Sequence, residues 1–190
     1  MGRTIGIDLG TTYTAVAYVD DYGKPMILKN SDGQSTTPSV VFFDAPAYAI
    51  GEVAVQSTLT DPERVVQFVK RFMGLKDHRV HVAGQSYSPE FVSSLILRKV
   101  VQEAESELGE TITDVVITVP AYFGEAQRHA TYEAGKLAGL NILRIINEPT
   151  AAALSYGVLN HGEPRYILVY DLGGGTFDVT IIALDNESVH

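Results

Sequence analysis

Short apolar runs separated by turn residues open the chain. They predict strands over residues 4–8, 14–19 and 25–28. The turns between them, at 10–12 and 20–23, contain glycine, threonine and aspartate, which favour tight reversals of the backbone. Strands joined by such short turns pair antiparallel. We therefore expect this part of the chain to form a meander.

Beyond residue 112 the pattern changes to alternating strands and helices. Continuous apolar runs, typical of strands buried on both faces, lie at 115–119, 142–146 and 166–170. Alanine-rich helical stretches lie between them at 124–138 and 149–156, and Gly157 is expected to end the second. This order predicts parallel strands joined by right-handed crossovers. Joined to the meander, they predict an α/β fold with one mixed five-stranded sheet and helices on both faces.

The middle of the chain predicts a small inserted α+β subdomain. Asp61-Pro62-Glu63 is typical of a helix start, with an N-cap aspartate and proline at the first helical position. The longest helix is expected to begin at Ser88-Pro89-Glu90 and to end at Gly109, with apolar residues at steps of three and four. The predicted organisation is a core subdomain of residues 1–43 and 113–190 and an insertion of residues 44–112.

Composition narrows the classes of function. The 190 residues are 45% hydrophobic and 19% charged, as in an ordinary globular domain, and carry a net charge of −9. Because the net charge is negative and the chain has no lysine or arginine cluster, a nucleic-acid partner is excluded. Cysteine is absent, and no apolar run approaches the ~18 residues of a membrane span. A strand follows Met1 almost at once, which leaves no room for a signal peptide, so we expect a cytoplasmic protein with no membrane partner.

Two glycine-rich turns carry the first hint of chemistry. Gly173, Gly174 and Gly175 lie between two apolar strands, with Asp171 before them and Asp178 after them. Such a turn admits close approach of another group, and its successive N–H groups can bind an anion. Residues 5–17 repeat the plan of strand, Asp-Leu-Gly, turn and strand. A plain glycine turn is the alternative for one copy, whereas two copies predict facing hairpins that grip a polyphosphate and its metal.

Three carboxylates are expected around one crevice. Asp8, Asp171 and Glu148 each follow a predicted strand, and ligands of open α/β sheets bind beyond the carboxyl ends of the strands. Carboxylates suit a hydrated Mg²⁺ that keeps most of its waters. The alternative for Glu148 is that it only caps the following helix. Neither the P-loop pattern nor G-x-G-x-x-G occurs in the chain.

Lys70 and three threonines complete the candidates. Lys70 adjoins an apolar run and could neutralise phosphate charge, although a solvated helix lysine is the more common interpretation. The hydroxyls of Thr11, Thr12 and Thr176 lie in the two turns, where they could bind phosphate oxygens or stabilise the turns locally. The five histidines show no metal-binding spacing.

Taken together, these residues resemble the actin-like (ribonuclease H-like) ATPase superfamily. More narrowly, the chain is similar to the first lobe of the ATPase domain of the seventy-kilodalton heat-shock chaperones, the DnaK type. The matching segments span nearly the whole chain in the order of the family: 6–13, 36–39, Lys70-Arg71, 119–123, 127–131, 145–153 and 171–180.

The resemblance implies ATP hydrolysis with Mg²⁺, and with K⁺ as a further ion. Asp8 and Asp171 would hold Mg²⁺ through water. Lys70, Glu148, Asp171 and Thr176 would be catalytic, with Asp178 nearby. ATP or ADP would contact the residues of the two turns, namely Asp8, Gly10, Thr11, Thr12, Tyr13, Gly173, Gly174, Gly175 and Thr176.

The resemblance also implies partners. Pro120 and Arg128 would relay the nucleotide state towards an interdomain linker, and Arg144, Asn147 and Thr150 match the surface that J-domain co-chaperones touch. A nucleotide-exchange factor and unfolded client peptides are expected partners in a chaperone of the stress response, the clients binding through a further domain.

The chain departs from the family pattern in three places. Gly124-Glu125 replaces the usual Asn-Asp, the stretch between Gly74 and Ser86 is short, and the second lobe and peptide-binding domain are missing. We therefore expect the isolated 190 residues to be inactive. The alternatives are an actin-like cell-shape filament protein, a sugar kinase, and a nucleotide sensor without turnover.

Overall fold

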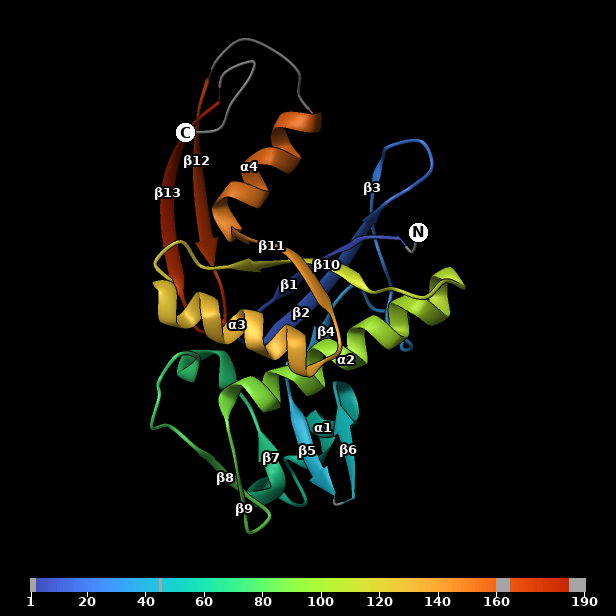
Figure 1. The fold of residues 1–190 in the computed structure, drawn as a ribbon, viewed down its shortest axis with the longest axis vertical. Coiled ribbons are helices and arrows are strands. Elements are labelled where there is room, and N and C mark those ends of the chain that lie inside the picture. The colour runs from blue at the N-terminus through green and yellow to red at the C-terminus, as the bar shows by residue number, and fades with distance from the viewer. Residues whose placement is uncertain (1–2, 45, 160–164, 185–190) are drawn as a thin grey trace.

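The main element of the fold is a mixed sheet, seen in a computed structural model that describes residues 3–44, 46–159 and 165–184 (Figure 1). Its strands run in the order β11-β10-β1-β2-β3, and β4 pairs with the other part of β2. β1 is parallel to β10 and antiparallel to β2, and β10 is parallel to β11. The predicted meander and the first parallel crossover are confirmed. The bounds are β1 (Ile5–Leu9), β2 (Tyr13–Val19), β3 (Pro25–Ile27), β4 (Thr37–Pro38), β10 (Asp114–Val119) and β11 (Asn141–Asn147).

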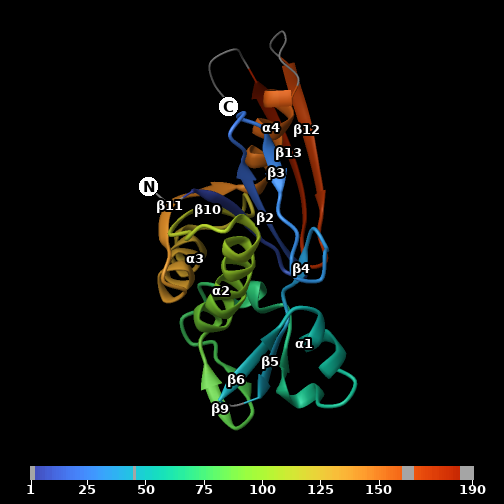
Figure 2. The same ribbon diagram turned by 90° about the vertical axis from the view of Figure 1, so that its right-hand side faces the viewer.

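Helices cover both faces of this sheet, as predicted. α2 (Pro89–Leu108) and α3 (Glu125–Leu137) lie on one face, and α4 (Glu148–Leu159) lies on the other (Figure 2). Alternation along β1 buries Ile5, Ile7 and Leu9 in the core with α2 and α3, while Gly6 and Asp8 face α4. The predicted start of α2 is correct, because Ser88 Oγ accepts a hydrogen bond from Phe91 N at 3.1 Å.

The predicted end of α4 is wrong. The helix continues through Gly157 to Leu159 rather than stopping at residue 156. Glycine ends a helix when it adopts a positive φ, as Gly109 does at the end of α2 with φ 67°. Gly157 lies inside the helix, where glycine lowers helix stability relative to alanine.

The expectation that residues 166–170 join the main sheet is also wrong. β12 (Arg165–Leu172) and β13 (Phe177–Leu184) pair antiparallel with each other, and within the described residues they form a separate two-stranded sheet. α4 packs against β10 and β11 and also against β12 and β13. The helix therefore lies between this hairpin and the main sheet, and in the described part of the chain β12 does not pair with β11 (Figure 1).

One face of the β12–β13 hairpin is apolar and exposed. Leu168 lies opposite Ile181 and Tyr170 opposite Val179, so alternate residues of the two strands form one continuous surface. Ile181 is 69% exposed, whereas Ile182, on the face that packs against α4, is 4% exposed. The exposed surface comprises Tyr166, Leu168, Tyr170, Leu172, Phe177, Val179 and Ile181.

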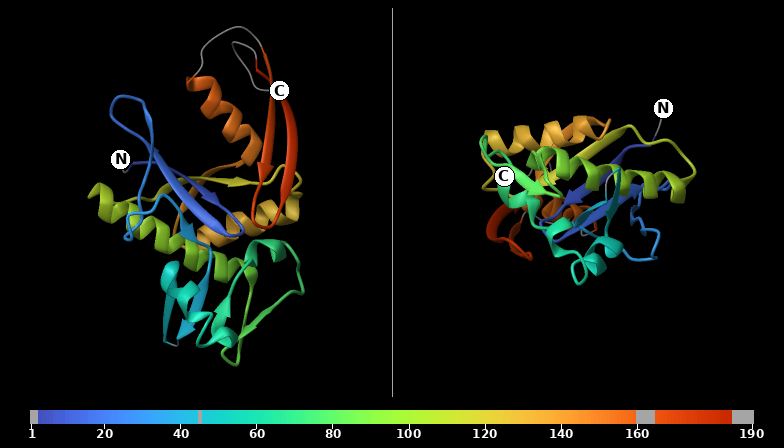
Figure 3. Two further views of the ribbon diagram at one scale, coloured as in Figure 1. Left: turned by 180° about the vertical axis from the view of Figure 1, so that it is seen from behind. Right: turned by 90° about the horizontal axis from the view of Figure 1, so that it is seen from below.

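The inserted residues form two small sheets below α2. β5 (Val41–Asp44) pairs with β6 (Ala47–Ile50) and β7 (Val65–Val66), α1 (Glu52–Ser57) follows β6, and β8 (Val80–Val82) pairs with β9 (Gln85–Tyr87). α2 packs on β2 and α3 above and on β5 and β6 below. Seen from behind, this helix runs between the two parts (Figure 3). The boundaries at 44 and 112 stay a prediction.

A helix or a turn was expected after Asp61, and within the described residues no α-helix forms there. Two 3₁₀ turns, η1 (Pro62–Arg64) and η2 (Val69–Phe72), take its place, with β7 between them. The β-branched pair Val65-Val66 is drawn into the sheet, where Val66 lies opposite Val41. The Asp61 side chain makes no capping hydrogen bond, and Phe68 has φ 59°, which breaks any helix before Lys70.

The adjacent residues Ile181 and Ile182 provide a matched test of the hairpin's two faces. Ile182→Ala removes buried methyl groups and is expected to lower the free energy of unfolding by about 2–4 kcal/mol. Ile181→Ala is expected to change it by less than about 0.5 kcal/mol because this side chain is already in water. Urea unfolding of both variants measures the difference, and equal losses would contradict the assignment of the two faces.

Candidate functional site

The two predicted glycine turns meet in the folded chain. Both hairpins are present, β1–β2 and β12–β13. A Cβ atom added at Gly174 would lie 1.9 Å from Thr12 Oγ1, and one at Gly175 would lie 2.5 Å from Thr11 Cγ2. No side chain larger than hydrogen fits between the turns, so glycine is required here for close approach.

A cavity of about 160 Å³ lies beside this contact. It gathers three carboxylates, one ammonium group and the backbone of both turns from segments far apart in the sequence. Its lining residues are Asp8, Gly10, Thr11, Thr12, Tyr13, Lys70, Glu148, Asp171, Gly173, Gly174 and Thr176. Of the residues predicted for the nucleotide site, Gly175 does not line the cavity, because it packs on Thr11. Asp178 lies opposite Asp171 across the hairpin.

A buried ion pair joins the inserted part to the main sheet. Lys70 Nζ donates a hydrogen bond to Glu148 Oε1 at 2.6 Å, and the two side chains are 8% and 14% exposed. Lys70 lies in η2 and Glu148 is the first residue of α4. The interpretation of Lys70 as a solvated helix lysine is therefore wrong. Glu148 does more than begin a helix, because its carboxylate binds the ammonium group.

The surroundings of Glu148 favour its protonated form. Burial raises the pKa of its carboxyl group above the ordinary value, and the nearby charges of Asp8 and Asp171 raise it further. The charge of Lys70 and its hydrogen bond act in the opposite direction, but they do not fully offset the burial. Lys70 is thus the group that favours the carboxylate form of Glu148.

Asp8 is oriented by a residue that the sequence reasoning missed. Thr118 Oγ1 donates a hydrogen bond to Asp8 Oδ1 at 2.8 Å. The parallel register of β1 and β10 places the two residues opposite each other. The signal was present in the sequence, since Thr118 is the polar residue in the apolar run 115–119.

The second turn has contacts from two further segments. Arg71 Nη2 lies 3.5 Å from Gly174 O, at the limit of a hydrogen bond. Tyr122, in the loop after β10, has a raised pKa because of burial and the nearby charges of Asp178 and Glu148, while a hydrogen bond with Thr176 lowers it. Both residues fall within motifs shared with the family, but neither was predicted to contact this turn.

The predicted partner-binding residues lie along the edge next to Glu148. Arg128 of α3 donates hydrogen bonds to Asn147 Oδ1 and to the carbonyl of Phe123, the latter at 3.0 Å. Pro120 is buried at the end of β10, and Arg144 is exposed on β11. Thr150 is half-buried in the first turn of α4. Their roles stay predictions, although Asn147 directly precedes Glu148.

The chemistry of the cavity fits phosphate groups with a hydrated cation. Thr12 Oγ1 is buried and has no hydrogen-bond partner within the described part of the chain, so a purely local role for this hydroxyl is wrong. The described residues contain no cluster of three acidic, histidine or cysteine side chains placed to hold a metal ion. Asp8 and Asp171 remain as two carboxylates, which suits Mg²⁺ bound largely through water. No helix in the described residues is long and apolar enough to cross a membrane.

Removal of Lys70 should make the stability of the protein more dependent on pH. In Lys70→Met the pKa of Glu148 rises further because both effects that lower it are lost. A carboxyl group whose pKa is higher in the folded state contributes less stability as the pH rises from its ordinary value of 4.5 through its folded pKa. We expect a loss of about 2 kcal/mol at neutral pH, shrinking towards pH 4.

Urea unfolding at several pH values and carboxyl ¹³C titration of Glu148 measure this effect. Arg64→Met is the control, because Arg64 pairs with Asp44 at the surface, where the two side chains are 42% and 65% exposed. A pH-independent loss in Lys70→Met, or an unchanged Glu148 titration, would contradict the proposed coupling.

Neighbouring glycines test the contact between the turns. Gly174→Ala places a methyl group against Thr12 and is expected to lower the free energy of unfolding by about 1–3 kcal/mol, with exchange of the Thr12 amide accelerated. Gly173→Ala is the control, because its nearest neighbour would be Thr176 O at 3.5 Å, an ordinary contact. Amide hydrogen exchange compares the two variants. If both behave alike, the turns do not touch in solution.

Comparison with known protein families agrees with this geometry. A family model described as Hsp70 protein matches residues 4–83 and 76–189. The two matched segments overlap at 76–83, within the stretch expected to be shorter than in the family. At the other departure, Gly124 directly precedes α3 and donates its N–H to Gln127 Oε1 at 3.0 Å, so the helix start is retained. The chain therefore belongs to the Hsp70 family, has the actin-like ATPase fold, and carries its two glycine turns in the chaperone nucleotide-binding domain.

Proposed function

We propose that the cavity between the two glycine turns binds the phosphates of ATP and ADP together with Mg²⁺. In the intact protein this site hydrolyses ATP and thereby drives cycles of binding and release of unfolded peptides. The observation that carries the proposal is the convergence of Lys70, Glu148, Asp8 and Asp171 on one cavity beside two touching turns.

Each group has a role that its chemistry supports. The N–H groups of the turns and the free hydroxyl of Thr12 bind phosphate oxygens. The ammonium group of Lys70 neutralises charge on the phosphate that is transferred. Because Oε1 of Glu148 accepts from Lys70, Oε2 remains to orient the attacking water. Mg²⁺, held by Asp8 and Asp171 through water, supplies charge neutralisation on the phosphates, and K⁺ is a further ion at this site.

The cavity accounts for the phosphate part of the ligand. Its volume of about 160 Å³ is below the roughly 300–1,000 Å³ typical of small-molecule sites. We infer that the 190 residues alone bind Mg·ATP more weakly than micromolar and turn over little of it. The adenosine part requires surface outside this cavity.

The partner surface is proposed to lie next to the site. Asn147 accepts a hydrogen bond from Arg128 and directly precedes Glu148 in the chain. A co-chaperone with a J-domain that contacts Arg144, Asn147 and Thr150 therefore acts one residue from the cavity. A nucleotide-exchange factor and client peptides complete the proposed cycle, which we place in the cytoplasm.

Turnover of ATP by the full-length protein tests the role of Lys70. Lys70→Ala is expected to lower kcat by about 10²-fold or more, because a preorganised charge aimed at the transferring phosphate is lost. Lys99→Ala is the matched control, since Lys99 pairs with Glu103 on α2, away from the cavity, and its loss should change kcat less than twofold. Phosphate release is measured at a temperature where circular dichroism shows each variant to be folded. Unchanged turnover in Lys70→Ala would refute the catalytic role.

A further inference from the structure

We propose that Ser39 is a positioning residue that sets the direction of the Thr11 amide in the first turn. Ser39 directly follows β4 and is 2% exposed. Its Oγ donates a hydrogen bond to Gly10 O at 2.8 Å, and its backbone N–H donates to Thr12 O at 2.8 Å. One buried residue thus holds two carbonyl groups of the turn. The inference rests on the proposed function, in which this turn binds phosphate.

The hydrogen bonds around Ser39 have a fixed direction. Thr14 Oγ1 and Ser39 Oγ are 3.0 Å apart. A serine hydroxyl has one proton, and that of Ser39 goes to Gly10 O, so Thr14 must be the donor to Ser39. Thr14 is 1% exposed, so water cannot replace either bond without opening the packing.

The planar peptide between Gly10 and Thr11 links the bond made by Ser39 to the direction of the Thr11 N–H. In a trans peptide the C=O of one residue and the N–H of the next point in opposite directions. The bond from Ser39 to Gly10 O therefore directs the Thr11 N–H away from Ser39. Thr11 lines the cavity and Ser39 does not, so this amide is directed away from β4 and is available to an anion in the cavity.

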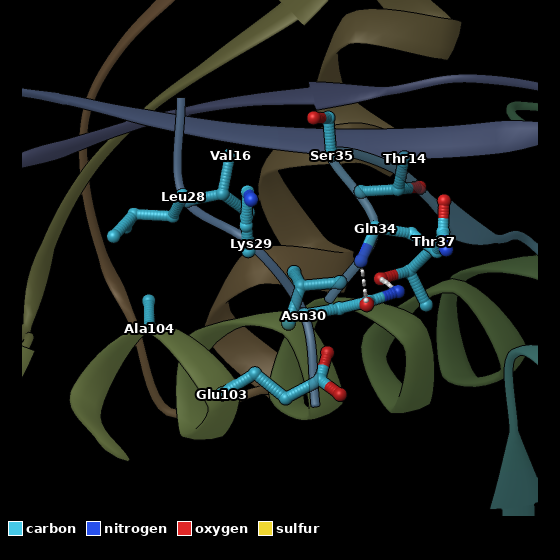
Figure 4. A pocket seen from close by; sticks show the side chains of 11 residues that line it. Thr14, Val16, Leu28, Lys29, Asn30, Gln34, Ser35, Thr37, Glu103 and Ala104 are labelled. Carbon is cyan, nitrogen blue, oxygen red and sulfur yellow. Dashed lines mark hydrogen bonds between the residues drawn. The ribbon is translucent and has the colours of Figure 1, made fainter. Parts of the chain in front are cut away.

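The loop that precedes β4 is fixed by hydrogen bonds of its own, and Figure 4 shows Asn30, Gln34 and Thr37 side by side. Asn30 Oδ1 accepts from Gln34 N at 2.8 Å, and Asn30 Nδ2 donates to Thr37 Oγ1 at 3.3 Å. Thr37 lies opposite Thr14 in the β2–β4 register. Ser31 at the start of the loop binds Oε1 of Glu103 on α2 through its hydroxyl at 2.7 Å. The loop before Ser39 is therefore fixed both to α2, through Ser31, and to β4, through Thr37.

Calorimetry with Mg·ADP on the full-length protein tests the proposal. Ser39→Ala is expected to weaken binding about tenfold and to reduce the ¹⁵N–¹H shift of the Thr11 amide on addition of Mg·ADP. Ser94→Ala is the matched control. Ser94 is also buried, and its hydroxyl donates to a carbonyl, that of Phe91 at 2.7 Å, within α2. Ser94→Ala should lower the melting temperature about as much as Ser39→Ala does, while the Mg·ADP affinity stays within twofold of that of the unsubstituted protein.

The outcomes separate the two proposals. No Mg·ADP binding by the unsubstituted protein would refute the proposed function. Binding that is equal in Ser39→Ala and Ser94→Ala, with the Thr11 shift retained, would overturn the role of Ser39 and leave the function intact. Should Ser39→Ala not fold, Ser39→Cys, whose thiol fills the same space but donates weakly, gives the same comparison.

Discussion

The buried bond between Lys70 and Glu148 is the interaction on which the site depends. It joins residues 78 positions apart, one from a 3₁₀ turn of the inserted part and one from the first turn of α4. Neither group is stable in this position alone, because burial disfavours an isolated charge and Glu148 also lies near Asp8 and Asp171. Pairing allows both charges to remain beside the glycine turns. The inserted part therefore supplies a positive charge to a cavity whose carboxylates come from β1, α4 and β12.

Local patterns predicted most of the fold, and non-local contacts account for the rest. The β1–β2 hairpin and α2 follow from apolar spacing and from turn and capping residues close together in sequence. The same information cannot say which strand β12 pairs with, because an apolar run describes burial and not the neighbour. Val65 and Val66 follow a predicted helix start and were expected in a helix or turn, but they pair with the edge of β5.

The same distinction applies to the site. The two turns were predicted as parts of the site because their glycines and aspartates lie close together in the sequence. The burial of Lys70 could not be predicted, since it depends on Glu148 and on the fold that brings them together. Thr118 and Ser39 act through hydrogen bonds to residues 110 and 29 positions away, and although Thr118 stands out as a polar residue in an apolar run, its partner cannot be read from the spacing. The contacts that could not be predicted are thus the hydrogen bonds that orient Asp8 and the first glycine turn.

The long helix α2 has a mechanical consequence. Its 20 residues form a rod of about 30 Å that packs on the main sheet, on β5 and β6, and on η2, which carries Lys70. A shift of η2 relative to α4 by about 1 Å would break this bond of 2.6 Å between Lys70 and Glu148. The hydrogen bond between Lys70 and Glu148 therefore depends on how the inserted part is oriented relative to α4. Because α2 contacts both the main sheet and η2, it is the element through which a movement of one part would reach the Lys70 side chain.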